Sequence, residues 1–363
     1  MMIDGFVMQL KECQNDALEV FARQLAAAQP LQEEQVRQAV ELLADESIPA
    51  PIKAGFLTAL AHKGETPDEI ASFARALRDK SLAPPLDAET RAGEILDVVG
   101  TGGDRHGTFN ISTAAALVCA AAGVKVAKHG NRAVTSQAGS ADVLEALGVR
   151  IDLSPADAAR SLREHGFAFF FAPAYHPAFK HIAPARKLCA EGGQRTVFNF
   201  LGPLLNPARP SAMLVGVPVP ELCEPLARVL QSLGVRRAMV VCGKAGTAGG
   251  LDELSTLGEN TIAEFYQERG LATSVMSPES FPLQRATLAD LLGGGKHQNA
   301  DIIRRIFHGE ERGPKRDAVL LNAAAALFVA GGARTMADGW SEAAATLDSG
   351  KAAAKLAELG GSI

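Results

Sequence analysis

The residues best suited to chemistry lie in short loops that follow apolar runs. The first loop, Gly100 to Asp104, comes directly after residues 95–99, which predict a buried parallel strand. Asn110 to Thr113 then begin an Ala-rich helix over about 114–122. A glycine loop between a strand and a helix presents backbone N–H groups to an anion, usually phosphate. Because its Gly-x-Gly-Gly pattern is neither a dinucleotide fingerprint nor a Walker loop, this loop alone fits a phosphate site or a tight structural turn equally well.

A second loop adds positive charge at the same edge of the predicted sheet. The strand predicted over 124–127 leads into Lys128 to Arg132, which contain Lys, His, Asn and Arg within five residues. A solvated charged loop is the alternative interpretation. The flanking glycines, Gly130 and Gly139, together with the strand end, favour a binding site for several phosphates.

Two adjacent acids, Asp252 and Glu253, follow Gly250-Leu251 in a glycine-rich loop after a predicted strand. By themselves they fit a solvated turn. Beside a polyphosphate site they have a further use, because magnesium prefers carboxylate and phosphate oxygens and keeps some of its waters.

A helix predicted after Tyr175 carries His176, His181 and Arg186. The two histidines fit a helix surface or a satisfied core position. Arg186 fits an ordinary surface ion pair, and its planar guanidinium would equally suit the carboxylate of a substrate.

Composition limits the class of protein. A chain of 363 residues with 47% hydrophobic and 21% charged residues predicts one large domain or two unequal globular domains. The net charge of -5 argues against a general nucleic-acid surface. The five scattered cysteines argue for a reducing compartment and against a disulfide framework or a zinc site. We find no secretion signal and no membrane span, and therefore expect a cytoplasmic protein without a membrane partner.

The order of predicted elements indicates two domains. Residues 1–88 read as helices only, and Thr66 to Glu69 form a capping box with Pro at the first helical position. After a linker over 82–86, strands and helices alternate, which predicts a mainly parallel sheet covered by helices. Further strands are expected over 168–171, 212–217 and 238–241, and a strand pair over 261–275 that turns at Arg269-Gly270.

Six motifs in a fixed order resemble those of the anthranilate phosphoribosyltransferase family, over about residues 31–330. Individually they are moderately specific, and together they are highly specific. They are Gly-Thr-Gly-Gly-Asp (100–104), Asn-Ile-Ser-Thr (110–113), Lys-His-Gly-Asn-Arg (128–132), the run from Gly139 to Gly148, Phe-Asn-Phe-Leu-Gly-Pro-Leu-Leu-Asn-Pro (198–207) and Gly-Leu-Asp-Glu (250–253).

The resemblance implies an α/β fold, in which a small N-terminal helical domain is hinged to a large domain with a mainly parallel sheet. The helical domain would take residues 1–90 with about 174–192 packed onto it, and the α/β domain 91–363. The family transfers phosphoribose from phosphoribosyl pyrophosphate to the amino group of anthranilate in tryptophan biosynthesis, with magnesium, as a homodimer. Compared with the family, the loops over 187–194 and 243–249 look longer.

The resemblance also implies roles for individual residues. The diphosphate substrate falls on Gly100, Gly103, Asp104, Thr108, Asn110, Ile111, Ser112, Thr113, Lys128, His129, Gly130, Asn131, Arg132, Ala133, Val134, Thr135, Ser136 and Ser140. The family's magnesium-binding positions correspond to Ser112, Asp252 and Glu253. Its anthranilate-binding positions correspond to Gly100, Asn131 and Arg186. The candidate catalytic residues are Lys128, Asn131 and Arg186.

Two other functions are considered. A pyrimidine-nucleoside phosphorylase shares the fold but needs a different set of residues to bind the base. It also needs a long C-terminal domain that we do not find here. A transferase-like protein that binds nucleic acid is disfavoured by the net charge of -5 and the intact acid pair.

Overall fold

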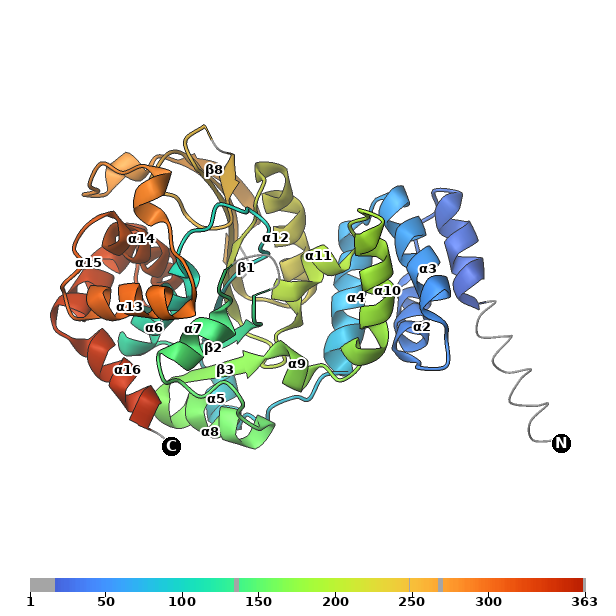
Figure 1. Ribbon diagram of the computed structural model, residues 1–363, viewed down its shortest axis with the longest axis horizontal. Coiled ribbons are helices and arrows are strands. Elements are labelled where there is room, and N and C mark those ends of the chain that lie inside the picture. The colour runs from blue at the N-terminus through green and yellow to red at the C-terminus, as the bar shows by residue number, and fades with distance from the viewer. Residues whose placement is uncertain (1–16, 134–136, 248, 267–269, 362–363) are drawn as a thin grey trace. The chain divides into compact units, whose positions relative to one another are not determined.

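The computed structural model describes residues 17–133, 137–247, 249–266 and 270–361. Its contacts divide the chain into a helical unit, formed by the residues up to Leu82 and by His176–Leu205, and an α/β unit, formed by Ala83–Tyr175 and Asn206–Ile363 (Figure 1). The short helix α5 (Ala88–Ala92) falls in the α/β unit, although the sequence placed residues up to 90 with the helices. The second helical segment runs to Leu205, beyond the expected 192, because its last turns pack on α4.

The helical unit is built from amphipathic helices whose starts are fixed by local hydrogen bonds. The predicted capping box is confirmed, since Glu69 N donates to Thr66 Oγ1 (3.2 Å) and Thr66 N donates to Glu69 Oε2 (2.9 Å). Lys63 pairs with the same carboxylate at 2.6 Å, in a buried setting. Within the unit α10 packs against α2 and α3. The helical segments are residues 17–26, α2 (Glu33–Ala44), α3 (Ala50–Lys63), α4 (Pro67–Asp79), α10 (Phe179–Glu191), α11 (Phe198–Leu201) and the 3-10 turn η1 (Gly202–Leu205).

His176, just before α10, is buried in the helical unit, and its ring packs edge-on against Phe179. Burial lowers the pKa of His176 to about 4. Below pH 6.5 the unfolded chain therefore takes up a proton that the folded ring resists until about pH 4, so the free energy of unfolding falls as the pH falls through this window. Between pH 7.5 and 5, the free energy of unfolding should fall by about 2 kcal/mol less in His176→Gln than in the wild type, as measured by urea unfolding. The exposed His62→Gln is the control, and an equal effect there would contradict this account.

The α/β unit contains, within its described residues, one eight-stranded sheet of order β3-β2-β1-β4-β5-β7-β8, with β6 paired to β5. The pairings that join β3, β2, β1, β4 and β5 are parallel, and β6, β7 and β8 are added antiparallel, which confirms the mainly parallel sheet. The strands are β1 (Ile95–Gly100), β2 (Lys125–Gly130), β3 (Phe167–Phe171), β4 (Ala212–Gly216), β5 (Arg237–Lys244), β6 (Gly250–Leu251), β7 (Asn260–Tyr266) and β8 (Ala272–Met276).

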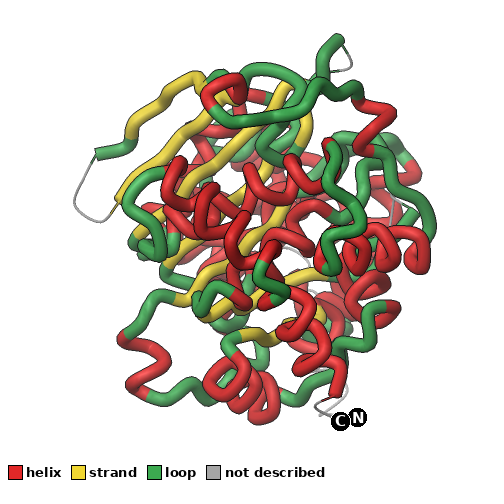
Figure 2. The backbone as a smooth tube through the Cα atoms, turned by 90° about the vertical axis from the view of Figure 1, so that its left-hand side faces the viewer, coloured by secondary structure: helices red, strands yellow, loops and turns green. Residues whose placement is uncertain are grey.

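Successive strand residues pack on opposite faces of the sheet, as the two-residue period of a strand requires. Leu96 and Val98 join the large core with α6 and α14, whereas Ile95 joins a smaller one with α8. Figure 2 shows the strands of this unit side by side with helices packed over them. The helices are α6 (Ile111–Ala121), α7 (Ser140–Ala146), α8 (Pro155–His165), α9 (Ala172–Tyr175), α12 (Cys223–Ser232), α13 (Lys296–Phe307), α14 (Pro314–Val329), α15 (Met336–Asp348) and α16 (Lys351–Gly361), with 3-10 turns η2 (Pro220–Leu222), η3 (Pro278–Ser280) and η4 (Leu288–Leu291). Among the helices described, none has the length and apolar character that a membrane span requires.

Candidate active site

The glycine loop after β1 is held in an unusual backbone conformation. Gly102, Gly103 and Gly107 have φ values of 74°, 96° and 71°, and Arg105 also has a positive φ of 59°. L-residues rarely adopt such angles, so glycine is favoured at positions 102, 103 and 107. A Cβ on Gly103 would meet no protein atom within 4 Å, so the space beside this residue is open. Gly102 and Gly103 thus adopt angles that favour glycine, and the space beside Gly103 leaves room for a ligand.

The carboxylate of Asp252 already binds one amide of this loop. Gly102 N donates to Asp252 Oδ2 at 2.7 Å. The same oxygen would lie 2.7 Å from a Cβ on Gly100, and the Asp252 carbonyl oxygen would lie 1.6 Å from one on Gly216. Only glycine therefore allows Asp252 to approach the ends of β1 and β4. A phosphate-binding loop would donate its amides to phosphate oxygens, and here the Gly102 amide donates to a side-chain oxygen instead.

Asp104 and Thr108 lie on the same loop. Asp104 Oδ1 accepts from His106 N (3.2 Å), and Asp104 Oδ2 lies 3.5 Å from Asp252 N. His106 Nε2 forms a hydrogen bond with Gly250 O (3.0 Å), which ties the loop to β6. Thr108 forms an isolated antiparallel bridge with Leu292. The loop is therefore fixed at its middle and at its end by contacts that the sequence analysis did not anticipate.

The N-terminus of α6 brings Ser112 to the acid pair. Ser112 N donates to Glu253 Oε1 at 3.0 Å. Asn110 donates to Ala138 O (3.2 Å) and accepts from Asn299 Nδ2 (2.9 Å) on α13. Ile111 and Thr113 are buried as whole residues, so neither side chain faces a ligand.

Asp252 and Glu253 have perturbed pKa values for a shared reason. Burial raises the pKa of Glu253 to about 7, and the charge of Lys128 opposes this shift. Burial, followed by the neighbouring carboxylate of Asp104, raises the pKa of Asp252 well above its usual range. A bound cation would favour the ionised forms of both carboxylates. Carboxylate oxygens are also ligands that magnesium prefers. In the described ranges no three His, Cys, Asp or Glu side chains form a complete metal cage, so the fit to magnesium relies on phosphate or water oxygens as further ligands.

Lys128 lies beneath the site and not in a loop. Strand β2 continues to Gly130, which pairs with Phe171 of β3, so it ends later than the predicted 127. Lys128 is only 2% exposed, and its Nζ donates to Val98 O at 2.6 Å. Burial lowers its pKa, whereas Asp97 and Glu253 oppose that shift. His129 is buried as well, and its N donates to Asp97 Oδ1 (3.4 Å).

Residues Asn131 to Ala133 and Ser140 lie together at the end of β2. Asn131 O accepts from Ala141 N (3.2 Å), and the Ser140 hydroxyl lies 3.5 Å from the same oxygen. A Cβ on Gly130 would lie 2.1 Å from Ser140 Oγ, which explains the glycine. The predicted positions Val134, Thr135 and Ser136 lie outside the described residues.

Arg186 belongs to the helical unit, on α10. Its guanidinium carbon lies 5.0 Å from the centroid of the Phe198 ring and 6.0 Å from that of Phe179. The side chain is exposed, and among the residues described no carboxylate pairs with it. Stacking on two aromatic rings orients the guanidinium and leaves its N–H groups available to a carboxylate.

Two buried polar residues near the site were missed by the sequence analysis. Asp97 on β1 is fully buried and accepts from Asn206 Nδ2 at 2.8 Å. Asn206 also donates to Ala127 O (2.7 Å), so it joins β1 and β2. An acid inside the apolar run 95–99 was a usable signal, because an unpaired buried carboxylate is costly.

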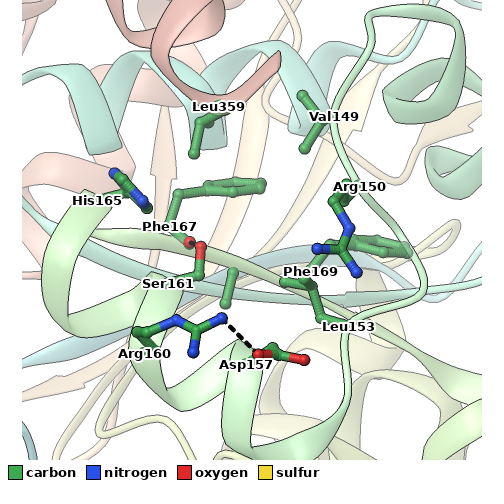
Figure 3. A pocket seen from close by; sticks show the side chains of 11 residues that line it. Val149, Arg150, Leu153, Asp157, Arg160, Ser161, His165, Phe167, Phe169 and Leu359 are labelled. Atoms are coloured by element: carbon green, nitrogen blue, oxygen red, sulfur yellow. Dashed lines mark hydrogen bonds and ion pairs between the residues drawn. The ribbon is translucent and has the colours of Figure 1, made fainter. Parts of the chain in front are cut away.

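A separate hollow lies at the edge strand β3, as Figure 3 shows. Its lining includes Arg150, Asp157 and Arg160, and Arg160 pairs with Asp157 at 2.5 Å. None of the predicted site residues contributes to this hollow.

Two family models match the chain. Residues 92–353 match the α/β domain of the glycosyl transferase family, and residues 21–81 match its helical bundle domain. Fold and family models thus define a glycosyl transferase whose α/β domain carries a glycine-rich loop beside an acid pair. An anthranilate phosphoribosyltransferase of Petrotoga mobilis is 45% identical over 339 residues, covering 93% of this chain and 95% of that protein. The chain belongs to the anthranilate phosphoribosyltransferase family.

Solved structures agree. The anthranilate phosphoribosyltransferase of Thermus thermophilus superposes with a TM-score of 0.84 at 42% identity, covering 94% of this chain and 98% of that one. The enzyme of the same name from Saccharomyces cerevisiae, solved in complex with PRPP and Mg, superposes with a TM-score of 0.83 at 28% identity, covering 95% and 98%.

Proposed function

We propose that this chain transfers the phosphoribosyl group of phosphoribosyl pyrophosphate (PRPP) to the amino group of anthranilate. The products are N-(5-phosphoribosyl)anthranilate and pyrophosphate, in tryptophan biosynthesis. The observation that carries the proposal is the meeting of an anion-binding amide, Gly102 N, with the acid pair Asp252 and Glu253 at the ends of parallel strands. The family membership supports the identity of the substrates.

The reaction needs charge neutralisation more than covalent chemistry. Displacement of pyrophosphate builds negative charge on the leaving group, and fixed N–H dipoles stabilise that charge without reorganising. We propose that the amides of Gly102 and Gly103 donate to the leaving diphosphate. Ser112, Asp252 and Glu253 would hold magnesium, and the bound metal would supply Lewis-acid stabilisation of the leaving group.

The buried Lys128 has a different part in this proposal from a direct phosphate contact. Its ammonium group donates to Val98 O and attracts the carboxylate of Glu253. It therefore adds positive charge below the site while keeping Glu253 more ionised than burial alone would allow. The amino group of anthranilate is nucleophilic when neutral, so the transfer requires no strong general base.

We further propose that Arg186 binds the anthranilate carboxylate. Arg186→Ala should raise the KM for anthranilate about 10- to 150-fold, since a lost charge-assisted hydrogen bond costs roughly 1.5–3 kcal/mol. The KM for PRPP should change little. Lys187→Ala, at the neighbouring exposed position, is the control and should leave both constants unchanged. Equal increases in both KM values for Arg186→Ala would remove Arg186 from the anthranilate site.

A fluorescence assay tests the function itself. Anthranilate fluorescence should fall on adding PRPP and magnesium, and should persist when either is left out. Phosphorolysis of uridine or thymidine without consumption of anthranilate would instead favour a nucleoside phosphorylase. Salt-sensitive binding of single-stranded DNA without transfer would favour the nucleic-acid alternative.

Two properties of the assembly belong to the same proposal. We propose a homodimer formed through the helical unit, which exposes the apolar side chains of Val20 and Leu188 at 48% and 42%. Light scattering of the protein as it elutes from a size-exclusion column measures the mass of the assembly, which should be that of two chains. We also propose a cytoplasmic location, because the four described cysteines are free thiols, as in a reducing compartment.

A further inference from the structure

The carboxylate of Asp142 links two backbone segments that follow the end of β2. Asp142, in the first turn of α7, accepts from Ala133 N at 2.9 Å and from Gly139 N at 3.0 Å, both through Oδ2. A Cβ on Gly139 would lie 2.5 Å from Ala133 N, so the two backbone segments are in direct contact. Asp142 thus joins two points of the chain that are six positions apart.

The other oxygen of Asp142 belongs to an ion-pair network. Arg132 Nη1 donates to Asp142 Oδ1 (2.9 Å) and to Glu145 Oε2 (3.1 Å), and Arg132 Nη2 donates to Glu145 Oε1 (3.0 Å). Lys296 of α13 donates to Glu145 Oε2 at 3.2 Å. The hydrogen bonds from Arg132 and Lys296 lower the pKa of Glu145 to about 2. Two carboxylates on α7 therefore hold the guanidinium of Arg132 in a forked arrangement.

This network braces Asn131. Arg132 N donates to the side-chain Oδ1 of Asn131 at 2.7 Å, and Asn131 O accepts from Ala141 N on α7. Asn131 is consequently tied to α7 in two ways, through Arg132 and through its own carbonyl. A change in the Arg132 pairing would therefore shift Asn131 and the end of β2.

We infer that Arg132, Asp142 and Glu145 are positioning residues for the proposed transfer, which set the backbone of Asn131 at the substrate site. Arg132 acts through α7 and does not contact the diphosphate. The inference rests on the proposed function and adds Asp142 and Glu145, which carry no predicted role, to the residues that the reaction needs.

Charge changes of opposite sign separate positioning from direct binding. Arg132→Gln removes a positive charge, whereas Asp142→Asn and Glu145→Gln each remove a negative one. If Arg132 bound the diphosphate, the first change would weaken PRPP binding and the other two would leave it unchanged or strengthen it. If the three residues position Asn131, all three changes weaken it in the same direction.

The experiment measures PRPP binding with magnesium by calorimetry, and kcat and KM by anthranilate fluorescence. We expect each single variant to raise the Kd for PRPP roughly tenfold and to lower kcat, and the double variant Arg132→Gln/Asp142→Asn to be no worse than either one, because partners in one network are non-additive. Arg132→Lys should recover part of the loss. The control Arg160→Gln breaks an exposed pair with Asp157 on α8 and should bind PRPP as the wild type does.

Each outcome decides a separate question. Tighter PRPP binding by Asp142→Asn and Glu145→Gln, or additive losses in the double variant, would overturn the positioning role while wild-type transfer stands. A wild-type protein that neither binds PRPP nor consumes anthranilate would instead overturn the proposed function. Glu145 is partly exposed, so Glu145→Gln should fold even if Asp142→Asn does not, and its Kd alone still decides between the two roles.

Discussion

The double variant Asp252→Asn/Glu253→Gln should need roughly 100-fold more magnesium for half-maximal activity, or lose activity altogether. Both changes keep the shape of the side chains and leave oxygens that can still accept from Gly102 N and Ser112 N. They remove the two charges that we propose to hold the metal. An amide oxygen is a much poorer ligand for magnesium than a carboxylate, so the loss should appear in the magnesium dependence first.

The same double variant should be at least as stable as the wild type without metal. Burial and neighbouring acids disfavour the ionised forms of Asp252 and Glu253, so neutral side chains remove an unfavourable interaction. Thermal melting in EDTA measures this, and Glu259→Gln, an exposed acid before β7, is the control. An unchanged magnesium profile together with normal activity would leave the acid pair with a structural role only, through the hydrogen bonds from Gly102 N and Ser112 N.

Gly103→Ala should abolish the stabilisation of the protein by PRPP with magnesium. A ligand that binds only the folded state raises its stability by about 2.7 kcal/mol at a concentration of 100 times the Kd. A Cβ on Gly103 would stand in the open space beside the loop amides, where we propose that the diphosphate binds. The variant should therefore melt at the same temperature with and without the ligand.

A matched glycine separates strain from lost binding. Gly103 has a φ of 96°, so its alanine variant should also lose on the order of 1 kcal/mol of stability without ligand. Gly331, in the turn after α14, has a φ of 74° and open space around its Cβ position. Gly331→Ala should show the same ligand-free cost and keep the full PRPP shift in differential scanning fluorimetry. A Gly103→Ala protein that melts early yet gains the full shift would falsify the phosphate-binding role of Gly103.

The elements that carry the site could be predicted because their signals are local. The apolar run 95–99 became β1, and the Ala-rich helix predicted over about 114–122 became part of α6. Helices α13 and α15 were not predicted, although Ile303, Ile306 and Phe307 already had helical spacing. In α13 a polar start, Lys296 to Asn299, hid the amphipathic pattern that follows.

The positions of charged side chains within the site could not be predicted, because they depend on strand pairing. Residues 128–130 read as a loop from the sequence, yet pairing with β3 extends β2 through them and buries Lys128. Which atom an acid contacts depends equally on distant segments, as with Glu253 and Ser112, which are separated by 141 positions.

The hydrogen bond from Gly102 to Asp252 also bears on the entropy of binding. A glycine-rich loop is expensive to order, since glycine loses more backbone freedom than any other residue. Here the side chain of Asp252 already orients the amide of Gly102, so part of this backbone freedom is lost before any ligand binds. Arrival of the proposed phosphate at this amide would then exchange one hydrogen-bond acceptor for another, so the loop would need little further ordering when the substrate binds.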